Sequence, residues 1–135
     1  MNIQVRYLSK SGNTKKVAEA IAEEVGVNAE PITKGVSKDT DILFLGGAVY
    51  WAGIDNELKK FILSLDGSVT KVAVFSTTAI TKSAYGEMKK LLKNKDIFVY
   101  DNEFHCRGEF SKFHKARPNA DDLKLSKQFA REIIK

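Results

Sequence analysis

Near its start the chain reads Asn2-Ile-Gln-Val-Arg-Tyr-Leu8, then Ser9-Lys-Ser-Gly-Asn-Thr14, then Lys15-Lys-Val-Ala-Glu-Ala-Ile-Ala-Glu-Glu-Val25. In the first segment apolar and polar residues alternate, which is the period of a β-strand. The apolar residues of the third segment fall on one helical stripe: Val17, Ala18, Ile21, Ala22 and Val25. The sequence therefore predicts a strand, a short polar turn and an amphipathic helix.

The polar turn carries the hydroxyls of Ser9, Ser11 and Thr14 around the pair Gly12-Asn13. The first N–H groups of a helix lack intrahelical acceptors and, joined by hydroxyl donors, form a site for an anion such as phosphate. An ordinary helix cap is the alternative, although a cap explains one or two hydroxyls more easily than three. Neither the spacing of a nucleotide-triphosphate loop nor that of a dinucleotide fingerprint is present.

Length and composition predict one globular domain over residues 1–135. Hydrophobic residues make up 43% of the chain and charged residues 29%, which is typical of soluble proteins. No apolar run approaches the roughly 20 residues of a membrane span, and no signal-peptide pattern precedes the first strand. The single cysteine, Cys106, excludes an internal disulfide, so we expect a cytoplasmic protein.

The rest of the chain alternates between strand and helix patterns. Further strands are expected at residues 28–33, 42–45, 72–75 and 97–100, the last continuing as far as His105 or Cys106. Helical spacing of apolar residues follows at 58–65, 84–92 and 125–133. Strict alternation predicts a parallel sheet with helices on both faces. Gln4 and Arg6 fit a central first strand poorly, unless the Arg6 stem packs and its head reaches an edge.

The turn Ser9–Thr14 resembles the phosphate loop of the flavodoxins. Gly46-Gly-Ala-Val-Tyr-Trp-Ala-Gly53 is similar to the second flavin loop of that family, and Phe104-His-Cys-Arg-Gly-Glu-Phe110 to its carboxyl-terminal part. The resemblance covers nearly the whole chain. It implies a doubly wound, five-stranded parallel α/β sheet in the order 2-1-3-4-5.

The resemblance also implies flavin mononucleotide (FMN) as cofactor, with its phosphate on the amides of residues 10–14. The ring needs flat apolar cover, for which Trp51 is the first candidate, Tyr50 the second and Tyr85 the third. Gly53 would permit a peptide flip toward the reduced ring; a turn glycine is the alternative. The expected cofactor-binding residues lie at three strand ends: Ser9, Lys10, Ser11, Gly12, Asn13 and Thr14; Ala48, Val49, Tyr50, Trp51, Ala52 and Gly53; and Ser76, Thr77, Thr78 and Tyr85.

Two features depart from the familiar electron carriers of this family. The third loop lacks the acidic residue that often accompanies a stacking tyrosine, although Thr77 and Thr78 can bond the ring edge. The net charge is +5 and the pI is near 9.3, so we expect redox partners with an acidic docking surface. Lys10 and Lys82 would favour an anionic reduced flavin.

Other partners and chemistries find less support. A solvated lysine-rich surface explains the charge better than nucleic acid, because the lysines are spread along the chain and no RNA-binding motif occurs. His105 and Cys106, adjacent on a strand, would point to opposite faces and so form no catalytic pair. Two histidines and one cysteine without zinc spacing predict no metal site.

The sequence thus favours a non-covalent FMN protein that carries one or two electrons between redox partners and has no catalytic side chain. Whether the chain is an enzyme stays open. One alternative is an FMN-dependent oxidoreductase with its own quinone or protoporphyrinogen substrate. Another is an interaction module of the same fold that has lost flavin.

Overall fold

The computed structural model describes residues 1–50, 53–78, 83–93, 95–108 and 116–135, with only the backbone of Tyr50. Within this part, seven strands form one sheet: β1 (Ile3–Tyr7), β2 (Ala29–Pro31), β3 (Thr40–Tyr50), β4 (Gly53–Ile54), β5 (Val69–Thr78), β6 (Phe98–Val99) and β7 (Phe104–Arg107). The helices are α1 (Asn13–Val25), α2 (Asn56–Ser64), α3 (Tyr85–Leu92) and α4 (Ala120–Ile134), with a 3-10 turn at Ile32–Lys34.

The strand order confirms the predicted doubly wound sheet. The parallel strands run β2-β1-β3-β5-β6, which is the order 2-1-3-4-5 when only the predicted strands are counted. The predicted fifth strand is broken in two: β6 pairs with the start of β5 and β7 with its end, both in parallel. β4 is an addition, a short antiparallel partner of β3 that periodicity gave no reason to expect.

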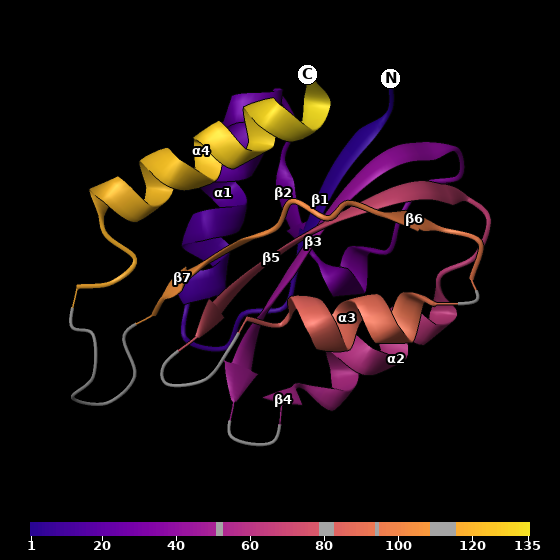
Figure 1. Cartoon of the computed structure of the whole chain (residues 1–135), viewed down its shortest axis with the longest axis horizontal. Coiled ribbons are helices and arrows are strands. Elements are labelled where there is room, and N and C mark those ends of the chain that lie inside the picture. The colour runs from indigo at the N-terminus through magenta and orange to yellow at the C-terminus, as the bar shows by residue number, and fades with distance from the viewer. Residues whose placement is uncertain (51–52, 79–82, 94, 109–115) are drawn as a thin grey trace.

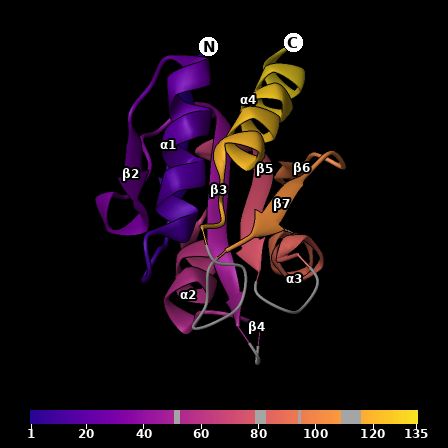
Figure 2. The ribbon, with the colours of Figure 1, turned by 90° about the vertical axis from the view of Figure 1, so that its left-hand side faces the viewer.

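The helices cover both faces of the sheet, α1 and α4 on one and α2 and α3 on the other (Figures 1 and 2). Each face has its own apolar core. Phe44, Phe75 and Phe129 lie in the first, and Leu43, Leu58 and Met88 lie in the second. The chain therefore buries both sides of its central strands, as a parallel sheet requires.

Two glycines make the middle of β3 possible. A side chain at Gly46 would come within 2.1 Å of the Phe75 ring, and one at Gly47 within 2.4 Å of Leu58. The sequence predicted a strand at residues 42–45; β3 passes through this glycine pair and continues to Tyr50.

Arg6 is one of the two polar residues that fitted a central strand poorly, and it is only 8% exposed. Its guanidinium donates to Gly35 O (2.6 Å), to Val5 O (3.0 Å) and to Gln4 Oε1 (3.0 Å). The head thus reaches the loop beside β2, where backbone carbonyls replace water.

The apolar stripe expected on the last helix needs a correction. Phe129 and Ile133 are buried, but Leu125 is 55% exposed. Strict four-residue spacing drifts around a helix that has 3.6 residues per turn. The buried face of α4 consists of Asp122, Ser126, Phe129, Ala130 and Ile133. No helix in the described ranges is long and apolar enough to cross a membrane.

Candidate ligand site at the carboxyl edge of the sheet

The chain order reverses between β1 and β3, because β2 lies on one side of β1 and β5 on the far side of β3. In open parallel sheets, ligands bind outside the carboxyl ends of the strands at such a point. The turn after β1 begins there, since Leu8 N–H donates to Gly46 O in β3 (3.1 Å). Because β1, β3 and β5 are parallel neighbours, the three predicted loops that follow them leave the same edge of the sheet.

The turn Ser9–Thr14 ends at the start of α1. Gly12 is the N-cap, with φ of +93°, and contributes no side-chain cap. Its N–H donates to Ser9 Oγ (3.1 Å), and its carbonyl accepts from Lys16 N–H (3.1 Å). No acidic residue stands in the first turn of α1. The positive end of the helix dipole is thus not balanced by a carboxylate of its own first turn.

The hydroxyls of this turn have different surroundings. Thr14 is 1% exposed, and its Oγ1 lies 2.8 Å from Thr77 Oγ1 at the end of β5. Ser11, in contrast, is exposed. Thr14 therefore fastens the helix start to β5, and Ser11 is the hydroxyl at the surface.

The second loop follows β3, which carries Ala48, Val49 and the backbone of Tyr50 to the edge and pairs with β4. Gly53 adopts a φ of +101°, and a side chain there would come within 2.6 Å of Glu87 Oε1. The same carboxylate oxygen accepts from Ile54 N–H (3.0 Å). Trp51 and the Tyr50 side chain, which were expected to cover the ring, lie outside the described residues, as does Ala52, which was expected to bind the cofactor.

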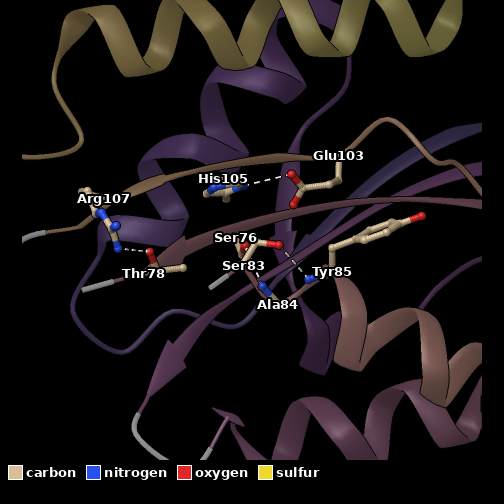
Figure 3. Close-up of polar contacts among 8 residues, drawn as sticks. All are labelled: Ser76, Thr78, Ser83, Ala84, Tyr85, Glu103, His105 and Arg107. Atoms are coloured by element: carbon tan, nitrogen blue, oxygen red, sulfur yellow. Dashed lines mark hydrogen bonds and ion pairs between the residues drawn. The ribbon is translucent and has the colours of Figure 1, made fainter. Parts of the chain in front are cut away.

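The end of β5, where the third loop begins, is held by two hydrogen bonds (Figure 3). Ser76 Oγ accepts from Ala84 N–H (3.1 Å), which ties the start of α3 to β5. Thr78 Oγ1 accepts from the Arg107 guanidinium (2.9 Å). The structure therefore gathers Ser76, Thr77 and Thr78 at the edge, with their hydroxyls in hydrogen bonds inside the protein.

Tyr85 is not brought together with these residues. It is the first residue of α3, and its hydroxyl lies 3.5 Å from Asp101 Oδ1. Figure 3 shows its ring directed away from Thr78 and Arg107. Lys89 stands over this ring, 5.4 Å from the centroid. Any role of Tyr85 in stacking would need a different side-chain orientation.

Lys10, expected to act as a positive charge near a ligand, forms an ion pair with Asp55 (2.8 Å). Asp55 also caps α2 by accepting from Glu57 N–H (2.8 Å). The hydrogen bond from Lys10, followed by that from Glu57, lowers the pKa of Asp55 below its ordinary value. Much of the Lys10 charge is thus matched by an internal carboxylate. Lys82 lies outside the described residues.

Sequence reasoning missed two residues of this edge, Arg107 and Gly108. A side chain at Gly108 would come within 2.9 Å of Asn13 Nδ2, so the end of β7 touches the turn Ser9–Thr14. Glu87, which accepts from Ile54 N–H next to Gly53, was missed as well. A position just after a strand is only a weak indication of a binding residue in the sequence. Which strand ends lie together is known only from the sheet topology.

His105 and Cys106 do point to opposite faces, as predicted. Cys106 is 8% exposed, and burial raises the pKa of its thiol to about 12. The His105 side chain is 51% exposed, and its Nδ1 lies 2.9 Å from Glu103 Oε2. Across the described ranges, no group of three or more His, Cys, Asp or Glu residues could hold a metal ion.

Comparison with known proteins identifies the family. Residues 4–118 match the flavodoxin domain family. A flavodoxin-like domain-containing protein, BilS of Clostridioides difficile, is 34% identical over 142 residues, covering 93% of this chain and 76% of that protein. An uncharacterised protein of Methanocaldococcus jannaschii is 27% identical over 91% of both chains. The chain belongs to the flavodoxin domain family.

Solved structures agree on the fold. A flavodoxin from the domain Archaea superposes with a TM-score of 0.80 at 20% identity, over 98% of this chain and 96% of that one. Oxidised Flavodoxin 2 of Bacillus cereus gives 0.74 at 17% identity, over 99% and 98%. Family membership sets the general class, a flavin-binding domain that transfers electrons to partner proteins.

Proposed function

We propose that this domain binds FMN non-covalently at the carboxyl edge of its sheet and carries electrons between partner proteins. The observation that carries the proposal is the start of α1. The N-cap, Gly12, has a left-handed backbone and no side-chain cap, and the first turn has no acidic residue. The positive end of the helix is therefore suited to binding an anion from outside the chain. The phosphate of FMN is an anion of suitable size and charge.

The residues present fit the rest of the cofactor. The turn Ser9–Thr14 would hold the phosphate through backbone N–H groups and the Ser11 hydroxyl. The loops after β3 and β5 would border the ring on either side, since both leave the same edge. Gly53 suits a close approach because its φ of +101° disfavours any side chain.

In this function the bound flavin supplies the redox chemistry, and the protein sets its environment. The Thr14–Thr77 hydrogen bond fixes the spacing between phosphate turn and third loop. Glu87 fixes the second loop through Ile54 N–H. Arg107 holds Thr78 and contributes positive charge at the edge. These residues hold the loops in position around the bound cofactor, and the proposal requires no proton transfer from any of them.

The test is a titration of the flavin-stripped protein with FMN, followed by flavin fluorescence. We expect saturable binding tighter than about 1 μM, or roughly −8 kcal/mol. Ser11→Ala should weaken binding of FMN but not of riboflavin, which lacks the phosphate. Ser37→Ala is the matched control, an exposed serine in the connection before β3. An absence of FMN binding at high concentration would refute the proposal.

A further inference from the structure

A groove of about 1180 Å³ lies between α3 and β6, at one margin of the sheet (Figure 1). Its strand side is formed by residues 97–99. Its helix side is formed by residues at helical spacing on α3, which are Gly86, Lys89, Lys90 and Lys93. β6 pairs with residues 71–72, near the beginning of β5. This α3–β6 groove is therefore separate from the candidate ligand site, which lies at the carboxyl end of β5.

The strand side of the groove is an open edge of the sheet. β6 is the last strand in the order, and among the described residues it pairs only with β5. Tyr100 N–H donates to Val72 O in β5 (3.0 Å). Because the peptide groups of a strand point alternately to its two sides, the N–H and C=O of Val99 point away from β5. This edge can therefore accept a further strand.

The groove also carries positive charge that the described residues do not match. Lys89 forms an ion pair with Asp101 (3.2 Å). The exposed ammonium groups of Lys90 and Lys93, in contrast, have no hydrogen bond or ion pair with any residue that the structure describes. Among the described residues that line the groove, only Asp96 bears a carboxylate. The groove therefore favours acidic side chains.

The two faces of an added strand would meet different surroundings. Val99 packs into the core on the α3 side of the sheet, so its neighbour Phe98 points to the other side. Phe98 is 57% exposed, and its ring meets that of Tyr100 edge to face, with 5.2 Å between the centroids. Side chains directed toward α3 would meet the lysines, and the alternate ones would meet Phe98. A strand in which acidic and apolar residues alternate suits both faces.

Gly86, the second residue of α3, keeps the groove open on the helix side. A side chain at this position would have nothing within 4 Å, and the backbone has no positive φ that would require glycine. Alanine is more favourable than glycine in a helix. The chain thus gives up some helix stability at a position where the only gain is room in the groove.

We propose that the α3–β6 groove binds an extended segment of a partner protein, with alternating acidic and apolar residues, as an additional strand on β6. The backbone of this segment pairs with Val99, its carboxylates contact Lys90 and Lys93, and its apolar side chains cover Phe98. A partner held here leaves the carboxyl edge of the sheet accessible. The inference goes beyond electron transfer and does not depend on flavin binding.

The test is an NMR titration of the flavin-free protein with the peptide acetyl-Glu-Val-Glu-Val-Glu-Val-amide. We expect saturable shifts of the Val99 amide and of the Phe98 ring, and slower hydrogen exchange of that amide. The scrambled peptide acetyl-Glu-Glu-Glu-Val-Val-Val-amide, and the alternating peptide with lysine in place of glutamate, should each bind about 10-fold more weakly. Equal binding of the alternating and scrambled acidic peptides, or shifts that leave out Val99, would overturn the proposal.

Gly86→Leu is the blocking variant, because it fills the groove without removing a contact. It should weaken binding of the alternating peptide by about 10-fold, while stability in urea stays equal or rises. Unchanged peptide binding in this variant would contradict the proposed position of the strand.

The contribution of charge is tested with two double variants. Lys90→Gln/Lys93→Gln should weaken binding about 5-fold at low salt. Lys34→Gln/Lys38→Gln is the matched control, since it removes two exposed lysines next to β2, at the opposite edge of the sheet. It should change binding less than about 1.5-fold. Equal effects of the two double variants would mean that only net charge matters, and would overturn the proposal.

The same spectra distinguish two other occupants of the groove. A Val99 amide that shifts with protein concentration in the absence of peptide would show that a second copy of the chain pairs with this edge. Groove signals that shift with phosphatidylglycerol vesicles and not with the peptide would indicate a lipid surface. Either result overturns the proposal. A failure to bind FMN would refute only the proposed function, because the titration uses flavin-free protein.

Discussion

Two helices of this domain begin in opposite ways, although both starts lie toward the carboxyl edge. α4 begins with Asn119, which accepts from Asp122 N–H, while Asp122 accepts in return from Asn119 N–H. Arg117 completes the arrangement by binding both carboxylate oxygens. At α1 the N-cap is Gly12, which has no side chain to cap the helix, and the first turn has no acidic residue. We call the α4 start closed, because the chain caps it internally, and the α1 start open.

If the proposed function holds, the difference separates a helix start that serves stability from one that serves binding. At α4 the chain supplies its own anion and satisfies the helix end internally. At α1 the equivalent place has no side-chain cap, and the proposed function assigns it to the phosphate of FMN. A binding site of this kind gives up part of the stability that a cap would contribute, about 1 kcal/mol.

The largest expected effect on stability comes from removing the internal cap at the closed start of α4. Asp122→Ala should lower the free energy of unfolding by about 3 kcal/mol, since it removes a cap and leaves the partly buried Arg117 without its carboxylate. Urea unfolding measures this. Asp121→Ala is the control, because Asp121 occupies the same turn but is exposed. Equal losses in both variants would contradict the distinction.

Closing the open start is the reverse experiment. Ser11→Asp places a carboxylate where the phosphate is proposed to bind, so FMN affinity should fall on the order of 100-fold, or about 2.7 kcal/mol. Riboflavin affinity and stability should change little. Ser11→Asn, similar in shape and uncharged, is the control. An unchanged FMN affinity in Ser11→Asp would place the phosphate elsewhere.

The closed start should also fail selectively in acid. Burial alone would raise the pKa of Asp122, but the hydrogen bonds from Arg117 and Asn119 prevail and lower it below 3.8. Stability from this group is therefore full above the unfolded value of about 4 and is lost as pH falls through the lower folded pKa. The stability difference between the original protein and Asp122→Ala should narrow below about pH 4. A difference that stays constant to pH 2 would contradict this.

A smaller effect should test how α1 is fastened. Thr14→Val should cost about 1.5 kcal/mol, because it leaves the buried Thr77 hydroxyl without a partner. The double variant Thr14→Val/Thr77→Val should cost less than the sum of the singles, by about 1 kcal/mol. Strict additivity in chemical denaturation would show that the 2.8 Å contact contributes no coupling.

The smallest effect concerns the ion pair beside the open start. The Lys10 side chain is 58% exposed, unlike the 8% of Asp122 in the closed start. Lys10→Gln should therefore change stability by less than about 0.5 kcal/mol. A loss near that of Asp122→Ala would show that Lys10 has a structural role that its exposure conceals.

The sequence alone determined the local chemistry of this protein. Periodicity separated strand from helix, and the hydroxyl-rich turn around Gly12 predicted an anion site, because these signals involve neighbours within a few residues. The same reasoning correctly placed His105 and Cys106 on opposite faces of their strand. It failed at Leu125, where an apolar residue at regular spacing lies on the surface.

Tertiary structure decided which distant residues meet. Gly46 and Gly47 are required by Phe75 and Leu58, side chains that no local pattern connects to them. Arg107 gained its importance because β7 pairs with the end of β5, which places it at Thr78. Lys10 pairs with Asp55 because the fold brings the start of α2 to the turn after β1. A sequence specifies the types of residue at a site, but their partners depend on how the strands are ordered in the sheet.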